Sequence, residues 1–349
     1  MNIKSVFTKK RVIILAVNLV CLTLSMIFSI VSDIQINGLT SQNGAEKWQN
    51  QNKDIDYTQI SCFFSDDSGM TENSVDAIRN AIETAMTSAS VKSDETSRLW
   101  IDTYTSTVGK YEVSGTKRGS AQTEIIAVTS DFFLIHDFDF VNGSYFREEE
   151  LSENGVVIDN SLAWQIFGSD DVIGMTVEIN SVSFYVAGVV DIPRCDAEKK
   201  TYGNLPRAYI TYNSAEKIGA ESLHVECYEV VMPNPVKNYA YNAINDFVST
   251  QYENTSHTVE NTTRFSLSNN FRRLKELSDT AIIDNSVSFT WWENSARVTE
   301  IKVSLNLFAI IIFLIVPIIT LIILLIKTFR FVKSKHILKC IFNKIKNKF

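Results

Sequence analysis

Histidine, cysteine and proline are all scarce in this chain of 349 residues, which contains four histidines, five cysteines and five prolines. A zinc site needs three or four converging ligands, and the one suggestive cluster is His136 with Asp137 and Asp139. In a strand, the two aspartates would share one face and the histidine would lie on the other. We therefore expect no metal and no other cofactor.

The cysteines also limit the class of protein. Cys62, Cys195 and Cys227 lie in the long central part of the chain, whereas Cys21 and Cys340 lie in or behind apolar segments near its ends. Three cysteines form at most one intrachain disulfide, which excludes a small disulfide-framework protein. A Cys195–Cys227 bridge is the minority alternative.

The signature loops of common enzymes are missing as well. No Gly-x-x-x-x-Gly-Lys-Ser/Thr occurs, and Gly109-Lys110 stands among strand-like residues. There is also no Gly-x-Ser-x-Gly, the turn that carries the serine nucleophile of many hydrolases. We expect a protein that is not an enzyme.

What the chain does have is two long hydrophobic runs. Residues 12–31 are almost all apolar, and residues 305–326 contain no charge. About 20 such residues are needed to cross a bilayer, so we predict two transmembrane helices. A secretory signal peptide is the alternative for the first run, but its hydrophobic core is usually only about 7–15 residues long.

Basic residues gather outside these runs. Residues 1–11 hold four Lys or Arg and residues 327–349 hold eight, with no acid in either segment. The positive-inside rule then places both termini in the cytoplasm, at the plasma membrane. The remaining 21 basic and 40 acidic residues give the central segment a net charge of −19. Such an acidic body is not expected to bind nucleic acid.

Residues 57–250 alternate between strand and helix patterns, which predicts an extracytoplasmic α+β domain. Strand 57–64 is followed by a helix with five apolar residues in phase, Val75, Ile78, Ile82, Ala85 and Met86. The same order recurs over 224–250, where the helical positions in phase are Val236, Tyr239, Ala243, Ile244 and Phe247. This repetition suggests a second lobe and an internal repeat in pattern, although the two segments show no visible sequence identity.

Two segments connect this domain to the predicted spans. Residues 32–56 are polar and show little regular period, and we interpret them as a membrane-proximal stalk, with a short helix as the alternative. Residues 251–304 form a connecting segment and a stalk helix that continues into the second span. Trp291 and Trp292 lie in that helix, either as anchors at the membrane interface or packed against the domain.

The most specific pattern is "VVIDNSLAWQIFGSDDVIGMTVEINSVSFYVAGVV", residues 156–190. It predicts a strand, a short helix over 161–167 and a left-handed stop at Gly168. Two further strands then pair across a hairpin turn at Asn180-Ser181.

This pattern resembles the extracytoplasmic core domain of MacB-type ABC transporter subunits, which are relatives of FtsX and of the lipoprotein-releasing permeases. The segments "VTSDFF" and "FVNGSYF" upstream agree with the same family, and the likeness covers about residues 128–191. The residues that carry the motif, with structural roles, are Asp159, Phe167, Gly168, Ile173, Gly174, Gly188 and Val189, together with Ala163, Val177, Glu178, Ile179, Phe184, Val186 and Val190.

The resemblance implies a bilobed core domain, built of strand-helix units plus a strand-rich insert, between two transmembrane helices. It also implies that such subunits dimerise, as homo- or heterodimers, and that a cytoplasmic ATPase moves the exterior domains. Complete family members carry two further spans after the second. We therefore expect this two-span form to need both an ABC ATPase subunit and a fuller permease subunit.

The basic tail, residues 327–349, has an amphipathic pattern. Its apolar positions Ile337, Ile341 and Ile345 recur every four residues, with Lys333 and Lys335 among the basic residues. Such a helix is expected to lie on the anionic inner leaflet. The alternative, which the resemblance suggests, is that it docks on the ATPase.

The leading hypothesis from the sequence is a non-catalytic membrane subunit of an ABC-type export or extracytoplasmic force-coupling system. The alternative is a stand-alone two-span sensor or scaffold that binds a peptide or an envelope protein. Neither the substrate nor the direction of transport follows from the sequence.

Overall fold

The computed structural model describes residues 8–49, 55–91, 98–115, 119–146, 154–220, 223–275 and 287–346, without the side chains of 335–346. Its contacts divide the chain into two compact units. One unit, the helical pair, holds residues up to Ile34 and from Lys302 onward. The other, the ectodomain, holds Gln35–Ile301.

The helical pair consists of α1 (Lys9–Asn37) and the longer part of α11 (Trp291–Lys346). Both helices are long and apolar enough to cross a membrane, and they contain the spans predicted at 12–31 and 305–326. The rings of Phe28 and Phe313 stack with centroids 5.9 Å apart. Asn18 of α1 also donates to the hydroxyl of Thr320 in α11, so the two helices contact each other through polar as well as apolar side chains.

The described residues of the ectodomain form ten strands in one sheet, in the order β10-β1-β9-β2-β3-β8-β5-β7-β4, with β6 pairing to β2 and β7. The strands are β1 (Tyr57–Phe64), β2 (Ile101–Gly115), β3 (Ser120–Val128), β4 (Phe140–Gly143), β5 (Gly155–Asp159), β6 (Thr176–Ile179), β7 (Val182–Val190), β8 (Arg207–Ile210), β9 (Cys227–Pro233) and β10 (Ser256–Glu260). The helices are η2 (Thr40–Gln42), α2 (Gly44–Gln49), η3 (Asp66–Ser68), α3 (Glu72–Ser88), α4 (Phe132–Ile135), α5 (Asn160–Ile166), α6 (Asp196–Thr201), α7 (Tyr212–Lys217), α8 (Tyr239–Gln251), α9 (Leu267–Lys275) and the first eleven residues of α11.

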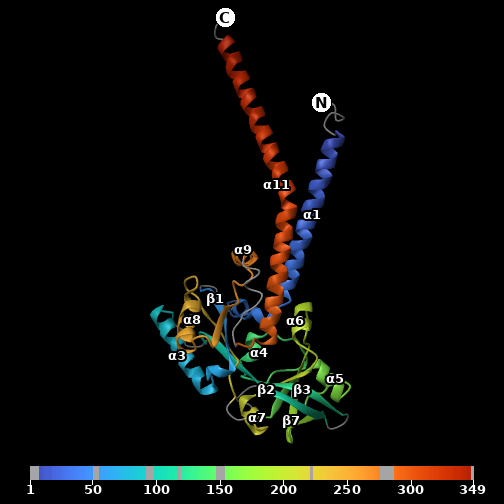
Figure 1. Cartoon of the computed structure of the whole chain (residues 1–349), viewed down its shortest axis with the longest axis vertical. Coiled ribbons are helices and arrows are strands. Elements are labelled where there is room, and N and C mark those ends of the chain that lie inside the picture. Colours follow the sequence, from blue (N-terminus) through green and yellow to red (C-terminus); the bar gives the residue numbers. More distant parts are fainter. Residues whose placement is uncertain are drawn as a thin grey trace. The chain divides into compact units, whose positions relative to one another are not determined.

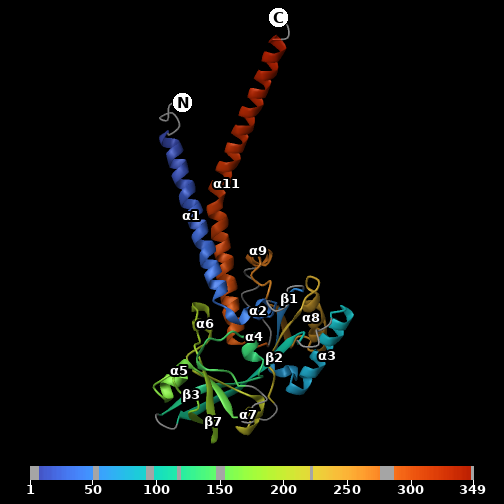
Figure 2. The same ribbon diagram turned by 180° about the vertical axis from the view of Figure 1, so that it is seen from behind.

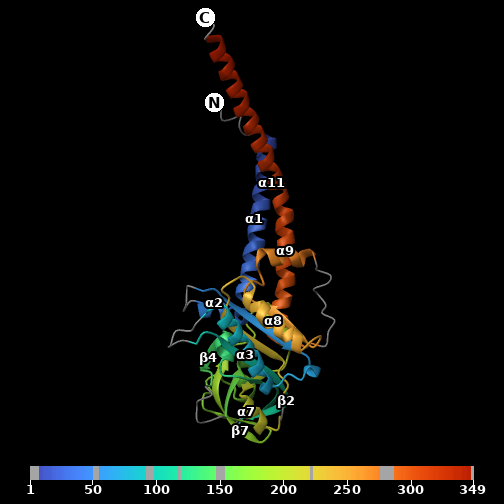
Figure 3. The same ribbon diagram turned by 90° about the vertical axis from the view of Figure 1, so that its left-hand side faces the viewer.

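The first lobe is a split β-α-β-β-α-β unit, with strand order β10-β1-β9-β2. Helix α3 follows β1 and helix α8 follows β9, and the two helices pack on each other. Figure 1 and Figure 3 show them side by side on one face of the sheet. The apolar side of β1, including Ile60 and Phe64, packs beneath them with the predicted helical positions Val75, Ile78 and Ile82.

The predicted phase of the second helix is wrong at one position. Helix α8 begins only at Tyr239, so Val236 precedes it and is 66% exposed. The buried side chains of α8 are Ala240, Ile244 and Val248. The pair Pro235-Val236 belongs to the loop after β9, where an apolar residue in apparent phase has no core to face.

The second lobe is a closed circuit of six strands. The pairs β2-β3, β3-β8, β8-β5, β5-β7, β7-β6 and β6-β2 complete the ring, and Figure 2 shows β3 and β7 in this lobe, with α5 beside them. Because β2 pairs with β9 near its start and with β3 and β6 farther along, it belongs to both lobes. The bilobed fold is therefore built on one continuous sheet.

The segment 155–190 folds as its pattern predicts. Helix α5 buries Leu162 and Ile166, and Gly168 follows it with φ of 72°, a conformation in which glycine carries no Cβ penalty. Asn180 and Ser181 both have positive φ in the two-residue turn between β6 and β7, as a type I′ hairpin requires.

Both faces of the first lobe are covered. On the face opposite α3 and α8, Phe63 joins a second buried cluster that contains Trp291 and Trp292. The part of the predicted stalk that the structure describes also packs here, because Ala45 of α2 is buried and Gly44 donates its N–H to Gln59 Oε1 at 3.0 Å.

Candidate coupling site at the base of helix α11

Among the predicted motif residues, Asp159 has the densest contacts. It precedes α5 and accepts hydrogen bonds from the N–H groups of Leu162 and Arg207, both at 2.7 Å, and from the hydroxyl of Tyr202 at 2.8 Å. Burial raises the pKa of Asp159, and these hydrogen bonds oppose the rise. The aspartate thus caps α5 and joins it to the start of β8, which is a structural role.

The other motif residues also occupy packing positions in the second lobe. Val189 is fully buried and Phe167 packs against the main core. Gly188 lies so close to β4 that a Cβ there would meet the carbonyl oxygen of Ser144 at 2.5 Å. Ile173 and Gly174 lie in the tight loop before β6. These motif residues therefore position strands and turns.

The tail residues are only partly described. Lys333 is exposed, and the backbone is helical through Lys346. The side chains of Lys335, Ile337, Ile341 and Ile345 lie outside the described residues. The amphipathic tail stays a prediction.

A different group of residues is concentrated around the α11 base, by which we mean Trp291–Ile301. Trp291 and Trp292 are 5% and 3% exposed, so the packed alternative for these tryptophans is the one observed. Trp292 lies edge-on to Phe132 after β3, and Trp291 to Tyr202 after α6. Phe63 of β1 belongs to the same cluster. Both lobes thus contact the first turn of α11.

A buried ion-pair network fixes the same helix. Arg264, between β10 and α9, donates to both carboxylate oxygens of Glu293 at 2.6 and 2.8 Å. Arg297 Nε donates to Glu293 at 2.7 Å, and Arg264 also pairs with Glu300. Positions 293, 297 and 300 share one face of the helix. Arg273 of α9 joins the network through Glu300.

The charges in this network stabilise one another. Burial alone would raise the pKa of Glu293, but Arg264 and Arg297 outweigh it and lower the pKa below its usual value. In Arg264, burial opposes the charged form, and the carboxylates of Glu293 and Glu300 raise the pKa despite it. Both partners are therefore ionised inside the protein, where an unpaired charge would be costly.

The same site contacts the segment that follows α1. Arg264 reaches the side-chain oxygen of Gln42 in η2 at 3.5 Å. Leu39 packs with Ala296 of the α11 base and Ala197 of α6, and Thr201 of α6 donates to the carbonyl oxygen of Trp291 at 3.0 Å. The two ends of the ectodomain that lead to the helical pair are thus joined to each other and to both lobes.

Beneath the tryptophans lies a second buried polar group. His136 Nε2 is 2.6 Å from Glu229 of β9, and the other oxygen of Glu229 accepts from Ser61 at 2.6 Å. Asn261 donates to Ser61 at 2.7 Å. His136 does not lie in a strand, because it directly follows α4, which ends at Ile135, and its side chain is fully buried.

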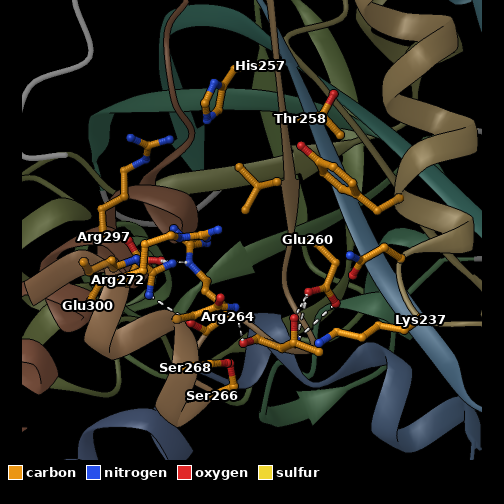
Figure 4. Close-up of a pocket in the computed structure, with 16 residues that line it drawn as sticks. Lys237, His257, Thr258, Glu260, Arg264, Ser266, Ser268, Arg272, Arg297 and Glu300 are labelled. Carbon is orange, nitrogen blue, oxygen red and sulfur yellow. Dashed lines mark hydrogen bonds and ion pairs between the residues drawn. The ribbon is translucent and has the colours of Figure 1, made fainter. Parts of the chain in front are cut away.

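Next to the network is a cavity of about 890 Å³, which we call the arginine pocket. It lies between α8, β10, α9 and the α11 base. Figure 4 shows Arg272 and Arg297 on one side and Lys237 with Glu260 on the other, while Ser266 and Ser268 lie at one end. The cationic residues that line it are Lys237, Arg264, Arg272, Arg273 and Arg297, and the acidic ones are Glu260 and Glu300.

Sequence reasoning missed most of this site. Glu293 follows the two tryptophans without a pattern that marks it, and Arg264 stands in a polar stretch without any periodic signal. Only Glu229 is marked by its surroundings in the sequence, because it is a carboxylate inside the largely apolar strand "CYEVVMP". Among the described residues, no group of three His, Cys, Asp or Glu side chains is placed to hold a metal ion, and Cys62, Cys195 and Cys227 are free thiols.

The comparisons with known proteins agree on the kind of domain. A family model described as "MacB-like periplasmic core domain" matches residues 13–240. The macrolide export ATP-binding/permease protein MacB of Nitrobacter winogradskyi is 28% identical over 86 residues, which cover 23% of this chain and 13% of that protein. The aligned part is thus a small fraction of the relative's length.

Solved structures with similarity to the ectodomain include two periplasmic or extracellular regions. The periplasmic region of MacB from Actinobacillus actinomycetemcomitans has a TM-score of 0.42 and 15% identity, over 59% of this chain and 89% of that one. The extracellular domain of the noncanonic ABC-type transporter YknZ from Gram-positive bacteria has a TM-score of 0.39 and 13% identity, over 58% and 99%.

Proposed function

The chain belongs to the family of the MacB-like periplasmic core domain, and from this premise we propose that it is a membrane subunit of an ABC-type export or extracytoplasmic force-coupling system. With its two apolar helices, it is a membrane protein with an extracytoplasmic domain. In the proposal it performs no chemistry itself. A separate ABC ATPase subunit and a fuller permease subunit supply the energy and the remaining membrane helices.

The observation that supports this function best is the construction of the α11 base. Its first eleven residues are part of the ectodomain, and the same helix supplies an apolar span. Glu293 and Ser295 are at most 1% exposed, and Arg264 holds the helix through two charged hydrogen bonds. Such a bidentate pair restricts geometry as well as adding energy.

Force transmission follows from this geometry. Because the α11 base contacts both lobes and the segment after α1, a displacement of α11 would act on the whole sheet rather than on one loop. A packed interior resists deformation, so the ectodomain would move as a body when the membrane helices move. We place both termini in the cytoplasm, where the basic tail lies on the inner leaflet beside the ATPase.

Co-purification tests the proposal. The tagged full-length chain is extracted from its own host in a mild uncharged detergent, and the recovered proteins are identified by mass spectrometry. We expect an ABC ATPase and a permease with more than two spans. A tagged two-span protein of unrelated sequence, at matched expression, controls for detergent carry-over. Recovery of neither partner above that control, with the chain itself intact, would mean that the proposed function is wrong.

A further inference from the structure

The arginine pocket is cationic within an acidic domain. Five basic and two acidic residues line it, although the segment between the basic termini carries a net charge of −19. Both acids are already engaged: Glu260 accepts from Thr58 at 2.7 Å, and Glu300 pairs with Arg264 and Arg273. The pocket therefore keeps an excess of positive charge that its own carboxylates do not neutralise.

That excess is carried by groups that face open space. Lys237 and Arg272 are exposed, and the structure gives neither of them a hydrogen-bond or ion-pair partner among the described residues. Arg297 uses Nε for Glu293 and lies over the ring of Phe289 at 3.8 Å, which leaves its two outer nitrogens available. Burial and the charges of Arg297 and Arg264 also lower the pKa of His257 at the far end of the pocket.

The remaining donors come from the start of α9. Ser266, Ser268 and Asn269 line the pocket at the start of this nine-residue helix. The hydroxyls of Ser266 and Ser268 hydrogen-bond to each other at 3.2 Å, which leaves one hydroxyl proton uncommitted, and the side-chain amide of Asn269 donates to the carbonyl oxygen of Thr263 at 2.9 Å. The first N–H groups of a helix have no partner within it and carry partial positive charge, which suits an anion. One hydroxyl, the first N–H groups of α9, an ammonium and two guanidinium groups thus line the same pocket from three different elements.

We propose that the arginine pocket binds a phosphate group, presented either by a soluble phosphate ester or by the headgroup of an anionic phospholipid. The converging donors exceed what the two oxygens of a carboxylate accept, whereas a phosphate offers three or four oxygens and pairs well with arginine. A cavity of about 890 Å³ also leaves room for the organic part that carries the phosphate.

Calorimetry on the full-length chain in uncharged maltoside micelles tests binding of soluble phosphate. Inorganic phosphate and glycerol 3-phosphate are titrated at low ionic strength into the wild type and into Lys237→Gln/Arg272→Gln. Because both positions are exposed, the double variant should fold, which its thermal unfolding curve checks. We expect it to weaken phosphate binding by at least about tenfold, from the loss of charge-assisted hydrogen bonds.

A second arm tests the lipid source. The chain is placed in nanodiscs with phosphatidylcholine, with or without phosphatidylglycerol, and retained lipid is measured by native mass spectrometry. If the headgroup is the ligand, phosphatidylglycerol is retained by the wild type and lost from the double variant. The matched control for both arms is Lys199→Gln/Lys200→Gln, which removes two exposed charges from α6.

The pocket variant and the α6 variant together distinguish binding in the pocket from attraction to net charge. Binding of phosphate or of phosphatidylglycerol that the pocket variant loses and the α6 variant keeps supports the proposal and identifies the source. Equal losses in the two variants would indicate attraction to net charge alone, and no binding in either arm would equally overturn the proposal. Neither arm contains an ATPase, so the result is independent of the function proposed above.

Discussion

Glu293 receives three charged hydrogen bonds from two arginines and is only 1% exposed. Its ionised carboxylate is therefore stabilised entirely by protein groups. Removing one partner of a buried pair leaves the other charge unpaired, whereas replacing both with apolar residues is often far less costly. The contribution of the ion pair to the free energy of unfolding can therefore be measured by comparing single and double replacements.

We expect Glu293→Gln to lower the free energy of unfolding of the full-length chain by about 3–5 kcal/mol, because Arg264 keeps its charge with only Glu300 as an anionic partner. Denaturant unfolding followed by tryptophan fluorescence measures this, since Trp291 and Trp292 lie in the same helix turns. The exposed Glu216→Gln is the control, with an expected change within about 0.5 kcal/mol.

A double variant sharpens this prediction. Arg264→Met/Glu293→Met should be less destabilised than the sum of the two single variants, because no unpaired charge of the pair remains. Strict additivity would show that the two side chains do not interact energetically, in conflict with the observed geometry.

Single residues were predictable where their role is set by local sequence. Gly168 ends a short helix, and Val75 and Ile78 lie on the apolar side of another, so periodicity and turn chemistry suffice to place them. Arg264 and Glu293 are 29 residues apart, and His136 and Glu229 are 93 apart. Such pairs form only when particular elements become neighbours in the fold, and local sequence patterns do not predict which elements do so.

At the scale of elements, α1 and α11 contact each other through polar side chains inside apolar spans. Asn18 Nδ2 donates to Thr320 Oγ1 at 3.3 Å, and Asn306 Nδ2 donates to Ser32 Oγ at 3.1 Å. Hydrocarbon offers these groups no alternative partner, so such contacts help to hold membrane helices together. These hydrogen bonds also explain why polar residues occur at these positions of two otherwise apolar segments.

We predict that Asn18→Leu and Asn306→Leu each weaken the helical pair by about 0.5–1.5 kcal/mol. Energy transfer between dyes on cysteines introduced at Lys10 and Thr328, in a background in which Cys21, Cys195 and Cys340 are replaced by serine, reports helix separation as SDS is added to mild micelles. Thr23→Val is the matched control, since its hydroxyl bonds to the carbonyl oxygen of Leu19 in its own helix. Equal SDS midpoints for the asparagine and threonine variants would contradict the prediction.

The elements themselves were largely predictable, but their order in the sheet was not. The hairpin at Asn180-Ser181 and the two strand-helix units follow from short-range patterns. The parallel pairs β3-β8 and β5-β7 join strands separated by whole elements, and the closed circuit depends on β6 reaching back to β2. The error at Val236 has the same origin, because periodicity does not show where the core ends.

At the scale of the whole molecule, charge and hydropathy predict the membrane topology of the chain. Twelve basic residues and no acids flank the two spans at the termini, and the family match identifies the central part as a periplasmic-type domain. The positive-inside rule predicts that both termini stay in the cytoplasm. The force-coupling proposal requires this arrangement, since the ATPase and the ectodomain must act on opposite sides.

Cysteine labelling in intact cells tests this topology. Lys199→Cys in the ectodomain and Lys333→Cys beyond the second span are introduced separately into a background in which Cys21, Cys195 and Cys340 are replaced by serine, because the remaining Cys62 and Cys227 are fully buried. A membrane-impermeant maleimide should label Lys199→Cys in intact cells, and Lys333→Cys only after permeabilisation. Both sites are exposed, so unequal labelling reports the side of the membrane rather than burial. Labelling of Lys333→Cys in intact cells would place the C-terminal segment outside, where no cytoplasmic ATPase could act on it.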